Sequence, residues 1–422
     1  MKYFKPTSPK GEPIKSIIFW LFKFNWVWPL DYKSSWIFVI LVNCLALTFL
    51  SCVFVTIYAE YLYINANQDD INKVAQCLCG FIFGILVIIK ILHLVSNRDQ
   101  MRRVLHTFYA EIYIHKSENE ELYKECERSL RLVYFMSSTF FLTTFSQFLS
   151  LGIAIARDPT STSKPYLVNM QFPYNAQEPW KYALTIMYTG WAAFSVVSIT
   201  SAEDCLIGST LSNCTIRYKM LHDDLSKLYE NSLKTLQSKP KSKFYRNNQL
   251  HEIFHQKLCT IIMKQQILDR FLQDLRSFLS LPIFVVVLFG IFLLCTVAFQ
   301  LQKNGISVDT LEYFFWLLAQ CLEFFVIGKF GQSCTDASAA MANAYYSCNW
   351  ESLLSHGNAV DNVKLIKNIS FLVFRAQKSV HLDGMNFMIL SLDSIGSAMS
   401  SSVSYFMFLS TMEDISNVKN EN

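Results

Sequence analysis

The chain has 422 residues, of which 52% are hydrophobic and only 17% charged, and its formal net charge is +4. A soluble protein of this length usually carries about 25% charged residues. The composition therefore argues against a soluble globular protein and indicates a chain that crosses a membrane several times.

The first apolar stretch, IIFWLFKFNWVWPL (17–30), is too short to span a bilayer. It is rich in aromatic residues, is interrupted by Lys23 and ends near Pro29, and it lacks the small-residue cleavage site of a signal peptide. Within an N-terminal segment covering 1–35, we predict an interfacial helix that lies along the membrane surface.

Seven longer apolar runs follow, and each reaches the ~20 residues that cross about 30 Å of hydrocarbon. They cover 36–58, 74–95, 130–156, 181–202, 276–300, 311–332 and 385–412. We therefore predict an all-α membrane protein with seven transmembrane helices. The first four, within 36–202, and the fifth and sixth, within 276–332, would form the main bundle.

Basic residues are distributed unevenly between these runs. Twenty-seven lysines and arginines lie in segments 1–35, 96–129, 203–275 and 333–384, whereas five lie in 59–73, 157–180, 301–310 and 413–422. The positive-inside rule places the first set in the cytoplasm. Seven crossings then leave a short extracellular tail at 413–422, which is the inverse of a G-protein-coupled receptor.

The two largest cytoplasmic segments have helical patterning. In 203–275, apolar residues recur at helical spacing from 254 onward and continue into the fifth run. We predict a long helix there that projects far from the membrane, preceded by a basic linker at 237–248. Together with 333–384, this region is expected to form a helical anchor that contacts sister subunits.

One motif suggests chemistry, but its context is poor. His251-Glu252-Ile-Phe-His255 matches the HExxH pattern of zinc hydrolases. No third ligand is evident, and the stretch is an amphipathic helix outside the apolar runs. We interpret the match as chance and expect no enzymatic activity, metal or cofactor.

Several ionisable residues lie inside the predicted spans, including Lys90 in span two and Glu323 and Lys329 in span six. Lys90 and Lys329 are near cytoplasmic ends, so we expect their ammonium groups to snorkel to the surface. Glu323 is closer to the middle of the membrane and should face protein or water rather than lipid. The sequence assigns it no function.

The outer halves of spans two, three, four and six carry bulky aromatic and methionine side chains and almost no charge. Such helices can enclose an apolar cavity that opens outward, although bundle packing or lipid contact explains them equally well. We find no acidic residue there to hold an amine, which favours a neutral, hydrophobic ligand. The candidate lining residues are Cys77, Phe81, Phe145, Phe148, Leu149, Met187, Tyr188, Trp191, Phe314 and Trp316.

The last run is unusual because SLDSIGSAMSSSVSYFMFL (391–409) carries many serines. At helical spacing its polar residues form one stripe that ends in two large apolar residues. Such a stripe fits a water-filled path closed by an apolar gate, provided that several copies surround one axis. Small-residue packing, as at Gly396 and Ser400, is the alternative. The stripe contains Asp393, Ser397, Ser401, Ser404, Phe408, Thr411 and Met412.

The C-terminal residues resemble the insect odorant receptors, specifically an odorant-specific (tuning) subunit. SLDSIGSAMSSSVSYFMFLSTM (391–412) is similar to the seventh span of that family. AYYSCNW (344–350) resembles the family's Tyr…Trp element after span six, and ISFLVFRAQKSVHLDGMNF (369–387) resembles the segment leading into span seven.

This resemblance implies an odorant-gated, non-selective cation channel in the plasma membrane, on the dendrite of a sensory neuron. The partners would be a small hydrophobic odorant and the family's common co-receptor, in a ring of four subunits; no nucleic acid is expected. The seventh helix would line the pore, with Phe408 and Met412 at the gate. Thr411 departs from the glutamine that the co-receptor carries at the polar position between them.

Other classes fit less well. Tyr405 is followed by FMFLS and Thr411-Met412, not by the Gln-Phe pair of the related gustatory receptors. A G-protein-coupled receptor is opposed by the charge distribution. A secondary transporter would be motivated by Glu323 and Asp393, but we find no inverted repeats with broken spans.

Overall fold

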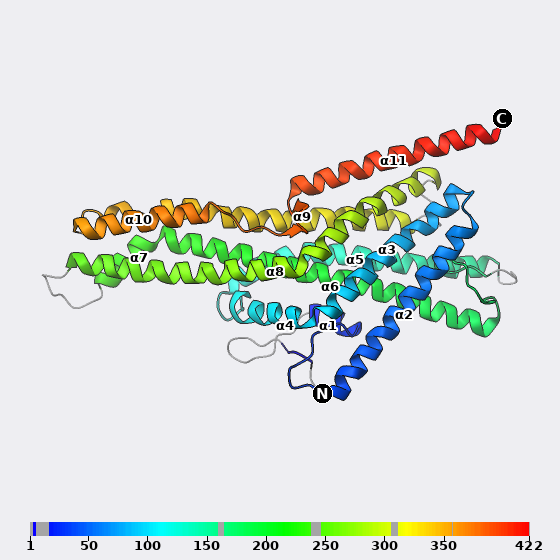
Figure 1. The fold of residues 1–422 in the computed structure, drawn as a ribbon, viewed down its shortest axis with the longest axis horizontal. Coiled ribbons are helices and arrows are strands. Elements are labelled where there is room, and N and C mark those ends of the chain that lie inside the picture. Colours follow the sequence, from blue (N-terminus) through cyan, green and yellow to red (C-terminus); the bar gives the residue numbers. More distant parts are fainter. Residues whose placement is uncertain are drawn as a thin grey trace.

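The structure is a computed structural model that describes residues 3–5, 17–158, 164–237, 246–304, 311–356 and 358–421. Helices dominate the described residues (Figure 1). The helices are α1 (Ile17–Phe24), α2 (Trp36–Ala66), α3 (Ile71–Ser96), α4 (Arg98–Thr107), the π-helical turn η1 (Phe108–Ile112), α5 (Glu120–Arg157), α6 (Pro179–Ser226), α7 (Leu228–Gln237), α8 (Arg246–Asn304), α9 (Leu311–Tyr346), the 3₁₀ turn η3 (Trp350–Leu353), α10 (Ala359–Ala376) and α11 (Leu392–Glu421).

Six helices in the described part of the chain are long and apolar enough to cross a membrane, namely α2, α3, α5, α6, α8 and α9. They coincide with the first six predicted runs. A seventh long helix, α11, occupies the position of the last run, and its many serines keep its hydropathy below that of the other six. It begins at Leu392 rather than at 385, because a short hairpin of β1 (Asp383–Gly384) and β2 (Met388–Ile389) precedes it.

Several helices extend well beyond the length that hydrocarbon requires. The uninterrupted helix predicted from 251 into the fifth run is confirmed, since α8 has 59 residues. At one end of the molecule α7 packs on the start of α8 and α10 on the end of α9 (Figure 1). We call these four parts the distal bundle. Tyr345 of α9 donates a hydrogen bond to Gln265 of α8 (2.5 Å), and Tyr218 of α6 donates one to Asp269 of α8 (2.6 Å).

A proline lies inside α8, and another helix compensates for it. Pro282 has no N–H, so the carbonyl of Phe278, four residues earlier, lacks its helical donor. His93 Nε2 of α3 lies 2.9 Å from this carbonyl, and the amide of Asn97 lies 3.2 Å from His93 Nδ1. An Nε2–H tautomer therefore satisfies the orphan carbonyl, which explains how α8 continues through the proline.

The hairpin before α11 is fixed to α8. Arg276 forms a two-pronged ion pair with Asp383, with Nε 2.9 Å from Oδ1. Met385 and Asn386 have positive φ values of 50° and 61°, as the central residues of a type I′ hairpin turn require. A Cβ atom at Gly331 of α9 would overlap the carbonyl oxygen of Leu390, which lies between β2 and α11. Because glycine has no Cβ, the start of α11 can lie close against α9.

The N-terminal apolar stretch forms only a short helix, α1. Phe22 and Trp28 are fully buried against the bundle, whereas Trp20 is exposed. Asn25 donates a hydrogen bond to Ser198 of α6 (2.7 Å), and Arg98 donates one to the Trp26 carbonyl (2.7 Å). The stretch is thus fastened to the bundle, and its position at the membrane surface remains a prediction.

Candidate functional site

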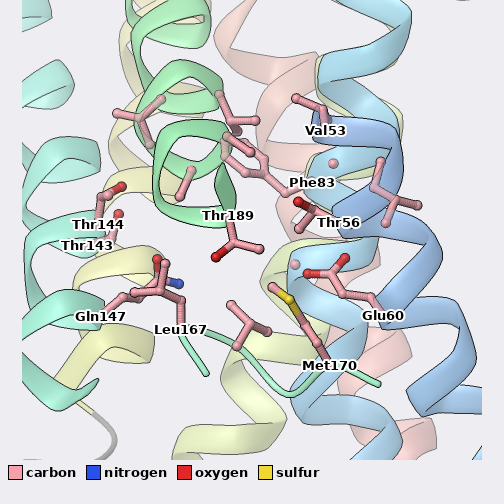
Figure 2. Close-up of a pocket in the computed structure, with 18 of the residues that line it drawn as sticks. Val53, Thr56, Glu60, Phe83, Thr143, Thr144, Gln147, Leu167, Met170 and Thr189 are labelled. Atoms are coloured by element: carbon pink, nitrogen blue, oxygen red, sulfur yellow. The ribbon is translucent and has the colours of Figure 1, made fainter. Parts of the chain in front are cut away.

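A cavity of about 90 Å³ lies between α2, α3, α5, α6 and α9, and Figure 2 shows the side chains that line it. Its wall is mostly apolar and includes Val53, Phe83, Phe140, Leu167, Met170 and Trp316. Small residues also line it, at Gly80, Gly84, Ala192 and Ala193. A shape of this kind suits a small hydrophobic molecule.

The segment between α5 and α6 closes the cavity. Leu167, Val168 and Met170 of this segment line it. The Gln171 N–H donates to the Ala59 carbonyl (3.0 Å), and the Asn169 amide donates to Gln76 (3.0 Å). The closing segment is therefore hydrogen-bonded to both α2 and α3.

Three of the four threonines in the wall use their protons within their own helix. The hydroxyls of Thr56, Thr143 and Thr189 donate to backbone carbonyls of the preceding turn, at 2.9, 2.6 and 2.8 Å. These threonines therefore offer the cavity only acceptor lone pairs.

The cavity also contains an acidic residue, which corrects our inference that none lies there. Glu60 of α2 is only 3% exposed, lines the cavity, and forms no ion pair with any described residue. Its Oε2 atom has no hydrogen-bond partner in the described part of the chain. Figure 2 shows its carboxyl group beside Thr56 and Met170, directed into the cavity.

The predicted lining residues lie mostly outside this cavity. Trp316 lines it, but the other nine do not. Phe145 and Met187 are 64% and 67% exposed, and Phe148, Leu149, Trp191 and Phe314 are also exposed. Cys77 is buried beside the closing segment, with its thiol 3.2 Å from the Asn169 carbonyl. Phe81 and Tyr188 are half-buried, and the Tyr188 hydroxyl lies 3.0 Å from that of Tyr174.

A buried charged cluster lies about two helical turns from the cavity, along α3, α6 and α9. Lys90 (α3), Glu203 and Asp204 (α6), and Glu323 (α9) each follow a cavity residue by seven positions, about 10 Å along a helix. Lys90 is 1% exposed and lies 2.7 Å from Glu203, so the expectation that it snorkels is wrong. Glu323 accepts a hydrogen bond from Gln320 (2.6 Å) and faces protein, as expected.

The predicted pore residues form an exposed stripe on α11. Asp393, Ser397, Ser401, Ser404, Phe408, Thr411 and Met412 are all exposed, while Ile395, Ala398 and Ser402 face the bundle. The hydroxyls of Ser397, Ser401 and Thr411 donate to carbonyls four residues earlier, at 2.9–3.0 Å. No atom lies within 4 Å of a Cβ placed on Gly396, so small-residue packing within the chain does not occupy this face.

The HExxH match has a structural role in this fold. His251 Nε2 lies 2.9 Å from the Leu353 carbonyl, and His255 lies beside Cys259. No group of three potential metal ligands was found among the described residues.

Comparisons with known proteins agree with the fold. A family model described as 7tm Odorant receptor matches residues 70–403. Odorant receptor 13a of Drosophila melanogaster is 25% identical over 97% of both chains, and Odorant receptor 35a is 21% identical over 98% of both. The solved structure of the olfactory receptor OR5 from Machilis hrabei in complex with eugenol superposes with a TM-score of 0.74, at 13% identity, over 94% of this chain and 97% of that one. Since the family model matches most of its length, this multi-pass membrane chain belongs to the insect odorant receptor family, whose members are ligand-gated channels and not enzymes.

Proposed function

We propose that this chain is the odorant-binding subunit of an odorant-gated, non-selective cation channel in the plasma membrane. A small hydrophobic volatile binds in the cavity, and α11 lines a pore shared with other subunits. The other subunits include the family's common co-receptor, in a ring of four. The ligand contacts come from the cavity wall rather than from the exposed aromatic residues.

The observation that carries this proposal is the exposed stripe on α11. A hydrophobic environment would disfavour the exposed carboxylate of Asp393 and the hydroxyl oxygens beyond it. An aqueous path between several copies of α11 provides them with water. Phe408 and Met412, which are 62% and 46% exposed, lie on the same face and suit an apolar constriction.

The charge distribution and the distal bundle support the rest of the arrangement. The excess of lysine and arginine in 1–35, 96–129, 203–275 and 333–384 favours a cytoplasmic N-terminus. The distal bundle then lies in the cytoplasm, where its exposed Val360, Phe371 and Phe374 on α10 are available for contacts between subunits.

Ligand binding opens the channel only if the open state binds the ligand more tightly than the closed state. The cavity of about 90 Å³ is compact, so a larger open-state cavity would give that preference. The Machilis hrabei receptor, solved with eugenol, supports a small volatile as the class of ligand for this fold.

Co-expression with the co-receptor tests the proposal. We expect volatile-evoked cation currents in excised patches without GTP, because no G protein is needed. Phe408→Ala and Met412→Ala should each change leak or relative ion permeability. Trp20→Ala, at an exposed position outside α11, is the control and should leave permeation unchanged.

Three results would contradict the proposal. Permeation that is identical in both α11 variants would remove α11 from the pore. Currents that require GTP, together with an extracellular N-terminal tag, would indicate a G-protein-coupled receptor. Substrate uptake without channel conductance would indicate a transporter.

A further inference from the structure

Two residues of the cavity wall each carry a buried polar atom for which the described part of the chain offers no hydrogen-bond partner. Glu60 Oε2 is a hydrogen-bond acceptor, and Trp316 Nε1 is a donor. Glu60 and Trp316 are only 3% and 6% exposed, and both line the cavity. Orphan polar atoms in buried positions are uncommon because each one costs free energy, so they call for an explanation.

Glu60 is held in place by a close contact with α3. A Cβ atom at Gly80 would lie 2.6 Å from Glu60 Oε1, so glycine is needed at this position to make room for the carboxyl group. Phe83 lies one turn further on the same face of α3, and its ring meets that of Trp316 edge to face, with centroids 5.6 Å apart. Neighbouring residues on one face of α3, Gly80 and Phe83, thus contact Glu60 and Trp316 respectively.

Glu60 offers an acceptor whatever its protonation state. An ionised carboxylate has two acceptor oxygens, and a protonated carboxyl keeps its carbonyl oxygen as an acceptor. The nearby threonine hydroxyls cannot supply the missing donor, because Thr56 and Thr189 donate to their own helix. A ligand in the cavity can supply both the missing donor for Glu60 and the missing acceptor for Trp316.

Resting on the function proposed above, we propose that the cavity selects small volatiles that carry a hydroxyl group. The hydroxyl donates a hydrogen bond to Glu60, and Trp316 Nε1 donates one to a ligand oxygen. An alkane leaves both orphan atoms unpaired, and an ether leaves Glu60 without a donor. An ammonium group has no acceptor for Trp316.

The test compares four ligands of equal heavy-atom number on the co-expressed channel: 1-hexanol, methyl pentyl ether, heptane and hexylamine. We expect 1-hexanol to act at concentrations at least about tenfold below the ether and heptane, the usual effect of leaving a buried polar group unpaired. Glu60→Leu should abolish this preference, whereas Glu60→Gln keeps an acceptor and should retain most of it. Trp316→Phe should reduce the preference for both oxygen-bearing ligands over heptane.

The variants are expected to fold. Glu60→Leu replaces an orphan carboxyl with an apolar side chain, so its apparent Tm should equal or exceed that of the wild type. Met187→Leu is the control: it changes an exposed residue outside the cavity and should leave the ligand ranking unchanged.

The outcomes separate this inference from the proposed function. Equal potency of all four ligands in wild type and Glu60→Leu would overturn hydroxyl recognition while leaving the channel in place. A preference for hexylamine that Glu60→Gln removes would overturn it in favour of an ammonium ligand. Absence of any current despite normal surface expression would contradict the channel function. In that case the Tm of the purified complex still decides the inference: 1-hexanol should raise it in wild type but not in Glu60→Leu.

Discussion

Polar side chains are buried around the cavity but exposed along the stripe on α11. Around and below the cavity, Glu60, Lys90 and Glu323 are buried by the chain's own helices. On α11, Ser397, Ser401 and Ser404 are exposed, and their hydroxyl protons go to backbone carbonyls of the same helix. A single chain therefore encloses its candidate ligand site but leaves its candidate pore surface open. The first region should be sensitive to mutation in the isolated subunit, and the second should matter only in the assembly.

The largest effect on stability is expected in the buried charged cluster, where the ammonium group of Lys90 lies among three acidic side chains. Lys90→Met leaves the carboxylates of Glu203, Asp204 and Glu323 without a positive charge, a change that typically costs about 3–5 kcal/mol. We expect loss of surface expression and a lower Tm of the purified complex. Adding Glu203→Gln should restore part of the loss, because it removes one of the uncompensated charges.

Lys329→Met is the matched control for this experiment. Lys329 is an exposed lysine of α9, and its loss should change stability by no more than about 0.5 kcal/mol. Normal expression of Lys90→Met would show that the cluster does not stabilise the fold, and the contrast between the two regions would then disappear.

A smaller effect is expected where α2 and α3 pack beside the cavity. Gly80→Val places side-chain atoms against Glu60, since even a Cβ would lie 2.6 Å from Oε1. Overpacking of this kind usually costs about 1–3 kcal/mol. The added methyl groups also fill cavity space, so the potency of every ligand in a dose–response measurement should fall.

Gly152→Ala provides the comparison. It also replaces a helical glycine, but no atom lies within 4 Å of the new Cβ. It should leave ligand potency unchanged and stabilise α5 by up to about 1 kcal/mol. Equal potency in the Gly80 and Gly152 variants would show that ligands bind elsewhere.

The helical framework could be predicted from the sequence because long apolar runs are a strong signal. The orientation inferred from the positive charges stays a prediction. It did not identify the cavity face, since in a membrane both lipid and protein contacts are apolar. On α5 the cavity side is Thr143, Thr144 and Gln147, whereas Phe145 and Phe148 point elsewhere. The usable signal on α5 was the hydroxyl-bearing residues at helical spacing, which share the face of Phe140, rather than the exposed aromatic residues.

The burial of Glu60 and Lys90 could not be predicted for a related reason. The apolar run at 36–58 stops before Glu60, although Val53, Ile57 and Glu60 share one helical face. The predicted span four ends at 202, so Glu203 falls in the segment expected in the cytoplasm, away from Lys90. The actual helix α6 continues to Ser226, so it brings Glu203 beside Lys90. Pairing across helices depends on tertiary structure and cannot be read from a single span.

The smallest effect is expected on α11, where two adjacent serines give a matched pair. Ser401 is exposed and Ser402 is 4% exposed, and each donates to the carbonyl four residues earlier, at 3.0 and 3.1 Å. Neither hydroxyl leaves a partner orphaned when removed, so each alanine variant should change stability by no more than about 0.5 kcal/mol. Only Ser401→Ala removes an oxygen from the exposed stripe. Single-channel conductance should therefore change in Ser401→Ala and stay constant in Ser402→Ala; the reverse pattern would place the other face of α11 at the pore.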